Sequence, residues 1–171
     1  MNKKNTRRFI VLAATLALAA CASVTPYQPA SKGFGYSSQR LESNRYRISF
    51  TGSSATPRQT VENYLLYQAA EVTLKSGDDY FVMTNSTTSA KGASGPNLSF
   101  GFGGFGFGSR SAVGVGVSTD TASAKGAEYT SQAEIVTFKG SKPADDPKAF
   151  DAREVQRNLE SGIVRPATPQ S

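Results

Sequence analysis

The sequence contains no histidine and no tryptophan, and its single cysteine is Cys21. Without histidine the chain cannot form a Ser-His-Asp or Cys-His catalytic group, and zinc sites that combine nitrogen and sulfur ligands are excluded with it. A single cysteine also excludes a disulfide within the chain. We therefore expect no cofactor and no metal site, and these residue types offer no catalytic group.

A long hydrophobic run is also missing. The longest run, residues 9–20, is broken only by Thr15 and spans about twelve residues, whereas a membrane-crossing helix needs about twenty. It follows residues 1–8, which hold four basic residues and no acidic one. A basic segment followed by a short apolar run is typical of a secretory signal peptide, which we predict over residues 1–20.

The predicted signal peptide ends in Leu18-Ala19-Ala20-Cys21, which resembles the lipobox of bacterial lipoproteins. The resemblance implies that the thiol of Cys21 receives a diacylglyceryl group and that further acylation, for example with palmitate, anchors the mature chain. Each buried lipid methylene contributes about 0.8 kcal/mol, so several acyl chains hold a protein stably. Ala22 in place of aspartate favours, by the sorting rule of enteric-type lipoproteins, the periplasmic face of the outer membrane over the inner membrane.

The formal net charge of +6 overstates how basic the mature chain is. Four of the 19 lysines and arginines lie in residues 1–8, which leaves 15 basic against 13 acidic residues. A net charge this close to zero is not typical of a nucleic-acid-binding protein. The expected partners are the membrane, through lipid on Cys21, and another envelope protein, and nucleic acid is not expected.

The mature part has about 150 residues, enough for one domain with a hydrophobic core. Residues 21–43 are rich in proline, serine, glycine and glutamine, and we interpret them as the lipidated cysteine and a tether. A single periplasmic domain is predicted over residues 44–163. Residues 164–171 contain prolines and are predicted to be a disordered tail.

Apolar patterning predicts the elements of this domain. Residues 45–50 alternate as a half-buried strand, with Tyr46, Ile48 and Phe50 on one side and Arg45, Arg47 and Ser49 on the other. Apolar residues at helical spacing predict a helix over 57–76. Thr56 is expected to cap this helix and Gly77 to end it. A second strand over 80–84 follows after a very short connection, so the two strands should be parallel, either adjacent or with a later strand between them.

The remaining pattern predicts a strand over 128–138 and a short helix opened by a capping box at Asp151 and Glu154 and ended by Gly162. The expected fold class is therefore α+β. We expect a mixed β-sheet with one long helix packed on a face, an extended Gly/Phe–Gly/Val β-hairpin and a short C-terminal helix.

The glycine-rich hairpin is predicted because phenylalanine and glycine alternate over 100–108, and valine and glycine over 113–117. Its turn could lie near 108–110 or at 103–104. Its large residues could complete the core, form an exposed ribbon that docks on a partner or a membrane, or belong to a low-complexity segment. The candidate interaction surface consists of Phe100, Phe102, Phe105, Phe107, Val113 and Val115.

The remaining motifs give little support for a nucleotide site, a cation site or a catalytic site. The G-x-G-x-x-G over 101–106 lies inside the Gly-Phe run with no helix after it, so a nucleotide site is not supported. A cation site at Asp78-Asp79 or Asp145-Asp146 is not favoured, because the first pair is typical of a turn and the second precedes Pro147 as helix-start residues. Glu62 and Glu71 are too far apart on their helix to share a face, and no lysine has a Ser-x-x-Lys context. No catalytic residue is therefore predicted.

Several blocks resemble a family of small uncharacterised lipoproteins of alphaproteobacterial type. The blocks are Gly35-Tyr36-Ser37, Arg45-Tyr46-Arg47-Ile48-Ser49-Phe50, residues 60–71 (TVENYLLYQAAE) and residues 150–155 (FDAREV). The resemblance implies a lipid-anchored periplasmic domain with no known activity. We expect a non-enzymatic binding or structural module. The alternatives are an envelope hydrolase that uses carboxylates or Ser/Lys, and a membrane-surface protein that acts through the hairpin.

Overall fold

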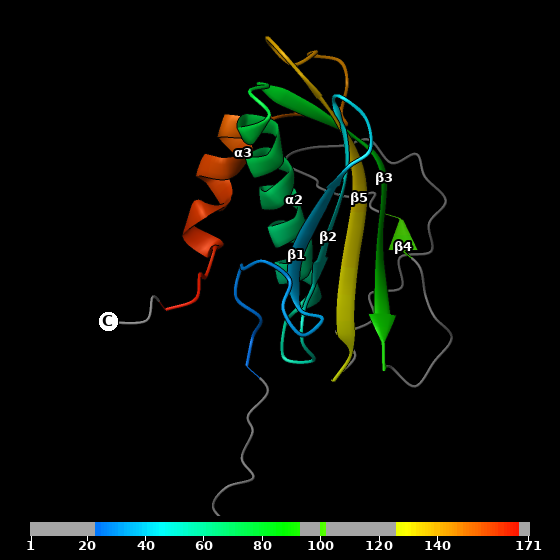
Figure 1. Cartoon of the computed structure of the whole chain (residues 1–171), viewed down its shortest axis with the longest axis vertical. Helices are drawn as coiled ribbons and strands as arrows, with labels where there is room; N and C mark the ends of the chain where they lie inside the picture. Colours follow the sequence, from blue (N-terminus) through cyan, green and yellow to red (C-terminus); the bar gives the residue numbers. More distant parts are fainter. Residues whose placement is uncertain (1–22, 93–99, 102–125, 168–171) are drawn as a thin grey trace, which may run out of the picture.

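The computed structural model describes residues 23–92, 100–101 and 126–167, and the fold is α+β as predicted. A six-stranded sheet carries a long helix on one face, and a short helix packs on the outer side of the long one (Figure 1). The elements are β1 (Gly35–Arg40), β2 (Arg45–Thr51), α2 (Arg58–Lys75), β3 (Tyr80–Lys91), β4 (Phe100–Gly101), β5 (Glu128–Phe138), β6 (Ala149–Asp151), α3 (Ala152–Leu159) and a 3₁₀ turn (Glu160–Gly162).

The strand order is β1-β2-β5-β3-β4, and β6 also pairs with β3. The strands β2 and β3 point the same way, as predicted, and the later strand β5 lies between them. The prediction of a mixed sheet is wrong. Because β5 is antiparallel to both of its neighbours, and the remaining strand pairs are antiparallel too, no parallel ladder joins the named strands.

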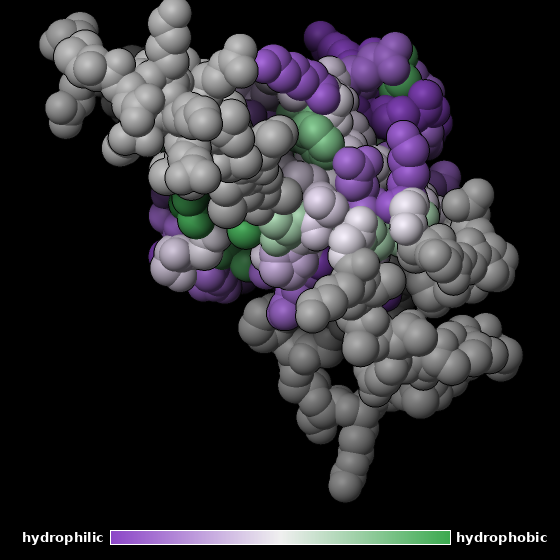
Figure 2. All heavy atoms as spheres, turned by 90° about the horizontal axis from the view of Figure 1, so that it is seen from below, coloured by the Kyte–Doolittle hydropathy of each residue, from purple (hydrophilic) through white to green (hydrophobic). Residues whose placement is uncertain are grey.

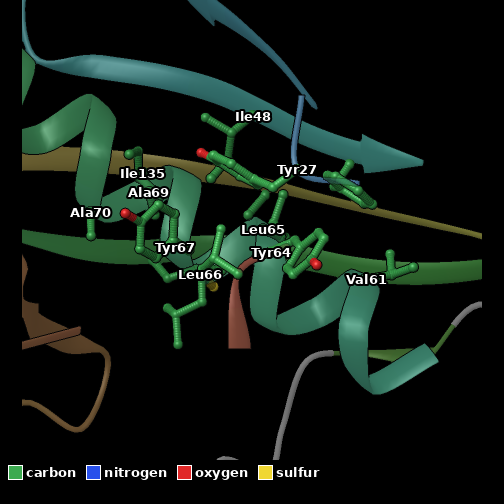
Figure 3. Close-up of a cluster of buried hydrophobic side chains, with 14 of the residues drawn as sticks. Tyr27, Ile48, Val61, Tyr64, Leu65, Leu66, Tyr67, Ala69, Ala70 and Ile135 are labelled. Atoms are coloured by element: carbon green, nitrogen blue, oxygen red, sulfur yellow. The ribbon is translucent and has the colours of Figure 1, made fainter. Parts of the chain in front are cut away.

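The core lies between the sheet and α2. The alternation predicted for β2 buries Ile48 and Phe50, and β5 covers the predicted range and buries every second residue, including Ala133 and Ile135. Figure 3 shows side chains of α2 meeting Ile48 and Ile135 of the sheet. Residues 64–70 of α2 are all buried, because the helix has the sheet on one side and α3 with the N-terminal segment on the others.

The ends of α2 differ in how well the sequence predicts them. Gly77 has φ +84°, and the Asp78 N–H donates to the Thr73 carbonyl at 3.0 Å, so the predicted left-handed end is confirmed. The predicted cap by Thr56 is wrong, because no side chain caps the start of α2. The Thr56 hydroxyl instead accepts the N–H of Thr25 at 2.9 Å.

The predicted tether and the domain boundary at residue 44 are also wrong. Thr25 and Tyr27 are only 4% and 5% exposed, and β1 pairs along its whole length with β2. The ring of Tyr27 contacts four other aromatic rings in the core. These are Tyr36, Phe50, Tyr64 and Tyr67, with centroids 4.6–6.5 Å away. Proline- and glycine-rich composition here marks an irregular packed segment rather than a flexible one.

The C-terminal part follows the prediction more closely. The Asp151 carboxylate accepts the N–H of Glu154 at 2.9 Å, which confirms the cap of α3. Before it, the unpredicted strand β6 pairs with β3 and stacks Phe150 on Phe81, with centroids 5.4 Å apart. The predicted disordered tail is wrong at its start, because the Val164 carbonyl accepts the Tyr27 N–H at 2.7 Å and the Val164 N–H donates to the Tyr64 hydroxyl at 3.0 Å.

The predicted Gly/Phe–Gly/Val hairpin lies outside the described residues, apart from β4. There Phe100 pairs with Thr88 and Gly101 with Thr87 at the edge of β3. None of the helices in the described part of the chain is both long and apolar enough to cross a membrane.

The packing of the N-terminal segment on β1 predicts unequal effects of alanine at two glycines. Gly35 has φ +110°, and a Cβ there would lie 2.5 Å from the Gln28 carbonyl oxygen, whereas Gly33 has φ +89° and open space. We expect Gly35→Ala to lower the free energy of unfolding by about 3 kcal/mol and Gly33→Ala by about 1 kcal/mol. Urea unfolding measures both. Equal losses would contradict the close contact of Gln28 with β1.

Candidate functional site on the open face of the sheet

No described helix covers the face of the sheet opposite α2 (Figure 1). Strand pairing arranges its side chains in rows that cross the strands. We call this surface the open face. Its rows are Thr51–Thr130–Ser89, Ser37–Ser49–Gln132–Thr87, Arg47–Glu134–Asn85, Arg45–Val136–Val82 and Phe138–Tyr80.

The first two rows are short and polar. Ser37 and Ser49 join their hydroxyls across β1 and β2 at 2.8 Å, and Thr51 and Thr130 do so across β2 and β5 at 3.2 Å. Gln132 in the second row is exposed. Short hydroxyl side chains leave this half of the face shallow, with groups that can both donate and accept hydrogen bonds.

The third row carries an oriented charge pair. An Arg47 guanidinium nitrogen donates to Glu134 Oε1 at 2.8 Å, and the side chains are 51% and 24% exposed. The hydrogen bond from Arg47 holds the pKa of the Glu134 carboxyl below its usual value. An ion pair with this much exposure adds little to the free energy of unfolding. Its main effect is to hold the guanidinium of Arg47 in one orientation across the middle of the open face.

A β-bulge lies beside this charge pair. The register of β3 against β5 shifts between Met83 and Asn85, and the extra residue Thr84 donates its hydroxyl to the Glu134 carbonyl at 3.1 Å. Bulges often occur where a sheet redirects a side chain. Here the bulge returns Asn85 to the row of Arg47 and Glu134.

The last two rows are apolar and aromatic. Tyr80 and Phe138 stack with centroids 5.1 Å apart and an interplanar angle of 18°. Both rings are only half-buried, as are Val82 and Val136 in the next row. Half-exposed aromatic rings next to arginines are the residue types that contribute most of the energy in protein interfaces. This end of the open face is thus suited to binding.

A cleft lies on the other side of the molecule, between the start of α2 and the end of α3. It encloses about 540 Å³. The polar residues that line it are Gln59, Thr60, Asn63, Asn158 and Ser161. They include no carboxylate and no lysine, so this cleft lacks the acid–base pair that the hydrolase alternative requires.

The described carboxylates near tyrosines have structural partners. The Tyr27 hydroxyl donates to Glu71 at 2.8 Å, and the Tyr67 hydroxyl donates to Glu160 at 2.6 Å. Burial raises the pKa of Tyr27 far above its ordinary value, and the hydrogen bond to Glu71 adds to the rise. Burial and Glu160 raise the pKa of Tyr67 in the same way. These contacts fasten segments to α2.

The Asp78-Asp79 pair lies in the connection between α2 and β3, as predicted, whereas the prediction that Asp145-Asp146 starts a helix is wrong, because β6 follows it and α3 begins at Ala152. Asp79 accepts the Gly140 N–H and an Arg153 guanidinium N–H, both at 2.9 Å, and these bonds hold its pKa below the usual value. Asp146 accepts the Lys148 N–H at 2.9 Å. Within the described ranges, no three Asp, Glu, His or Cys residues gather as a metal site would require.

The predicted site residues lie mostly outside the described part of the chain. This holds for Cys21 and, in the hairpin, for Phe102, Phe105, Phe107, Val113 and Val115. Of Phe100 only the backbone pairing is described. The sequence did place Arg45, Arg47 and Ser49 on the outward side of their strand, but it missed β1, whose residues after Tyr36 are all polar and carry no alternation.

Comparison of the chain with family models, with curated proteins and with solved structures found no match. The candidate site therefore depends on its own geometry. The lipoprotein resemblance carried by residues 45–50 and 60–71 stays a prediction.

The buried tyrosine hydroxyls predict a loss of stability at alkaline pH. A tyrosine whose pKa is raised in the folded state stabilises the fold fully below the unfolded pKa of about 10, and this contribution falls as pH rises above it. We expect the domain to lose stability above pH 10 and Tyr27→Phe to weaken that dependence while costing about 1 kcal/mol at pH 7.

Urea unfolding at pH 7, 9 and 10.5 measures this, with Tyr46→Phe as the control because Tyr46 is a half-buried tyrosine that packs against the core and is not one of the four rings in contact with Tyr27. An alkaline slope that is the same in Tyr27→Phe as in the unaltered chain would contradict the assignment.

Proposed function

We propose that this protein is a lipid-anchored lipoprotein of the bacterial envelope, held on the periplasmic face of the outer membrane by Cys21. It acts without catalysis and binds another envelope protein through the open face of the sheet. The observation that carries the proposal is the aromatic pair Tyr80–Phe138 next to the arginine rows, on a face that no helix in the described part of the chain covers.

The anchor is supported by the basic segment, the short apolar run and the lipobox-like residues 18–21. The single cysteine lies where a lipobox requires it. Catalysis is disfavoured by the missing histidine and by the structural partners of Glu71, Glu160 and Asp79.

The open face has the layout of a protein interface. An apolar end of aromatic rings and valines adjoins arginines, and hydroxyls and amides form the polar remainder of the face. From strand spacing, four strands and five rows span roughly 15 Å by 26 Å, or about 400 Å². Stable complexes bury about 800 Å² on each partner, so we expect a weak or transient complex.

The anchor predicts acylation at one residue. In cells grown with radiolabelled palmitate, the unaltered chain should be labelled and should fractionate with the outer membrane, whereas Cys21→Ser should carry no label. Ala22→Asp should keep the label and move to the inner membrane. Label on Cys21→Ser would contradict the anchor.

The interface predicts a position-dependent crosslink. A photo-reactive amino acid at Val82 or Thr87, both on the open face, should give one discrete crosslinked band that mass spectrometry can identify. The same amino acid at Arg157, which is exposed on α3, should give none.

Removing an interface side chain should weaken the crosslink without unfolding the domain. Arg47→Ala loses only an exposed ion pair, so stability should change by less than about 1 kcal/mol while the band at Val82 falls severalfold. A folded protein with no band at Val82 and Thr87, or an equal band at Arg157, would contradict the open face as the binding surface.

A further inference from the structure

The N-terminal segment is fixed to the domain from Ser23 onward. The Thr25 N–H donates to the Thr56 hydroxyl at 2.9 Å, and the Ser53 N–H donates to the Thr25 hydroxyl at 2.8 Å. The Ser53 hydroxyl donates to the Ser23 carbonyl at 2.7 Å. The loop 52–56 thus holds the backbone of Ser23 and Thr25 and the side chain of Thr25.

This attachment leaves very little chain between the domain and Cys21. Only Ala22 separates Cys21 from Ser23. An extended chain covers at most about 3.6 Å per residue, so the Cα of Cys21 lies within about 7 Å of the Cα of Ser23. A lipid on Cys21 must therefore enter the bilayer next to the surface from which the N-terminal segment leaves the domain.

We call that surface the anchor-proximal end, made of residues 23–25, the turn 31–34, the loop 52–56, the end of β3, the start of β5 and Val164, which follows Ile163 beside Pro57. Strand register gathers these segments, because Gly35 pairs with Thr51, Thr51 with Thr130, and Thr130 with Ser89. Figure 1 shows the N-terminal segment leaving at this lower end of the sheet, and Figure 2, seen from below, shows hydrophobic residues among hydrophilic ones there.

The exposed apolar residues gather near the same exit. Among the described residues, the large hydrophobic side chains exposed to solvent are Val24 and Val164, at 45% and 62%. They belong to neighbouring segments, because the Tyr27 N–H donates to the Val164 carbonyl at 2.7 Å. Exposed lysines, Lys32 and Lys91, lie in the turn before β1 and at the end of β3.

We propose that the anchor-proximal end rests directly on the phospholipid surface and holds the domain in one orientation. Val24 and Val164 meet the apolar boundary of the bilayer, and Lys32 and Lys91 meet lipid phosphates. The inference rests on the proposed function, because it needs the lipid on Cys21. The strands then stand away from the membrane, and the eleven residues from Glu128 to Phe138 carry the Tyr80–Phe138 pair about 30 Å from it.

The test uses the acylated full-length chain in vesicles of phosphatidylethanolamine and phosphatidylglycerol. The acylated Cys21 has no free thiol, so a single new cysteine at Ser54, Val164 or Ser141 can carry a nitroxide label. Ser54 lies in the loop 52–56, and Ser141 follows the distal end of β5. Oxygen dissolved in lipid and a nickel complex dissolved in water each speed the relaxation of the nitroxide, so a high oxygen-to-nickel ratio marks a label next to lipid. We expect this ratio to be severalfold higher at Ser54 and Val164 than at Ser141.

A matched variant separates the short connection from the lipid itself. Eight Gly/Ser residues inserted between Ala22 and Ser23 span about 16 Å as a flexible chain. This insertion should keep the acyl group and reduce the ratio at Ser54 and Val164 to that at Ser141. An unchanged ratio at Ser54 after the insertion would overturn the role of the short connection, because the end would then bind lipid by itself.

The outcomes also distinguish this inference from the proposed function. An acylated protein with an equally aqueous label at all three positions overturns the fixed orientation and leaves the lipoprotein assignment standing. Absence of the acyl group by mass spectrometry, with the chain recovered from cells, overturns both.

Discussion

The burial of Tyr27 between the sheet and α2 is the contact on which the arrangement of both chain ends depends. Its ring meets Phe50 of β2 and two tyrosines of α2, and its backbone N–H binds the carbonyl of Val164. A buried tyrosine removes about 150–250 Å² from water, which corresponds to at most about 4–6 kcal/mol. Whole domains are stable by only about 5–15 kcal/mol, so this one residue contributes a large part of the margin.

Because Tyr27 is buried, the segment after the predicted lipid belongs to the domain. The backbone N–H of Tyr27 also holds the C-terminal segment by its hydrogen bond to Val164. The ion pair Glu160–Arg165 and the hydrogen bond of the Val164 N–H to the Tyr64 hydroxyl hold the same segment. Both segments leave the first half of α2 covered and the opposite face of the sheet open. If a lipid is attached at Cys21, one end of the domain is set against the membrane and the aromatic end of the open face points into the periplasm. Anchor and binding surface would then be fixed relative to each other by the strands between them.

The sequence predicts those elements whose apolar pattern has a clear period. β2, α2, β5 and the cap of α3 follow from alternation, helical spacing and Asp151, and the direction of β3 follows from its short link to α2. Pairing between distant segments leaves no local signal. The sequence analysis therefore misses β1 and β6 and wrongly predicts a mixed sheet. It also predicts Thr56 as a helix cap, although the Thr56 hydroxyl accepts the backbone N–H of Thr25. The sequence predicts which residues of β2 face outward, but only the strand order shows that they form one surface with Tyr80 and Val82 of β3.

The claim that the residues after the anchor form a cooperative part of the domain can be measured by amide hydrogen exchange in the native state. The account predicts that the amides of Thr25 and Tyr27 exchange as slowly as the amides in the middle of β5, because releasing either one requires the core around α2 to open. Exchange of Thr25 and Tyr27 at the rate of an unstructured peptide, with β5 still protected, would contradict it and would restore a flexible tether between membrane and domain.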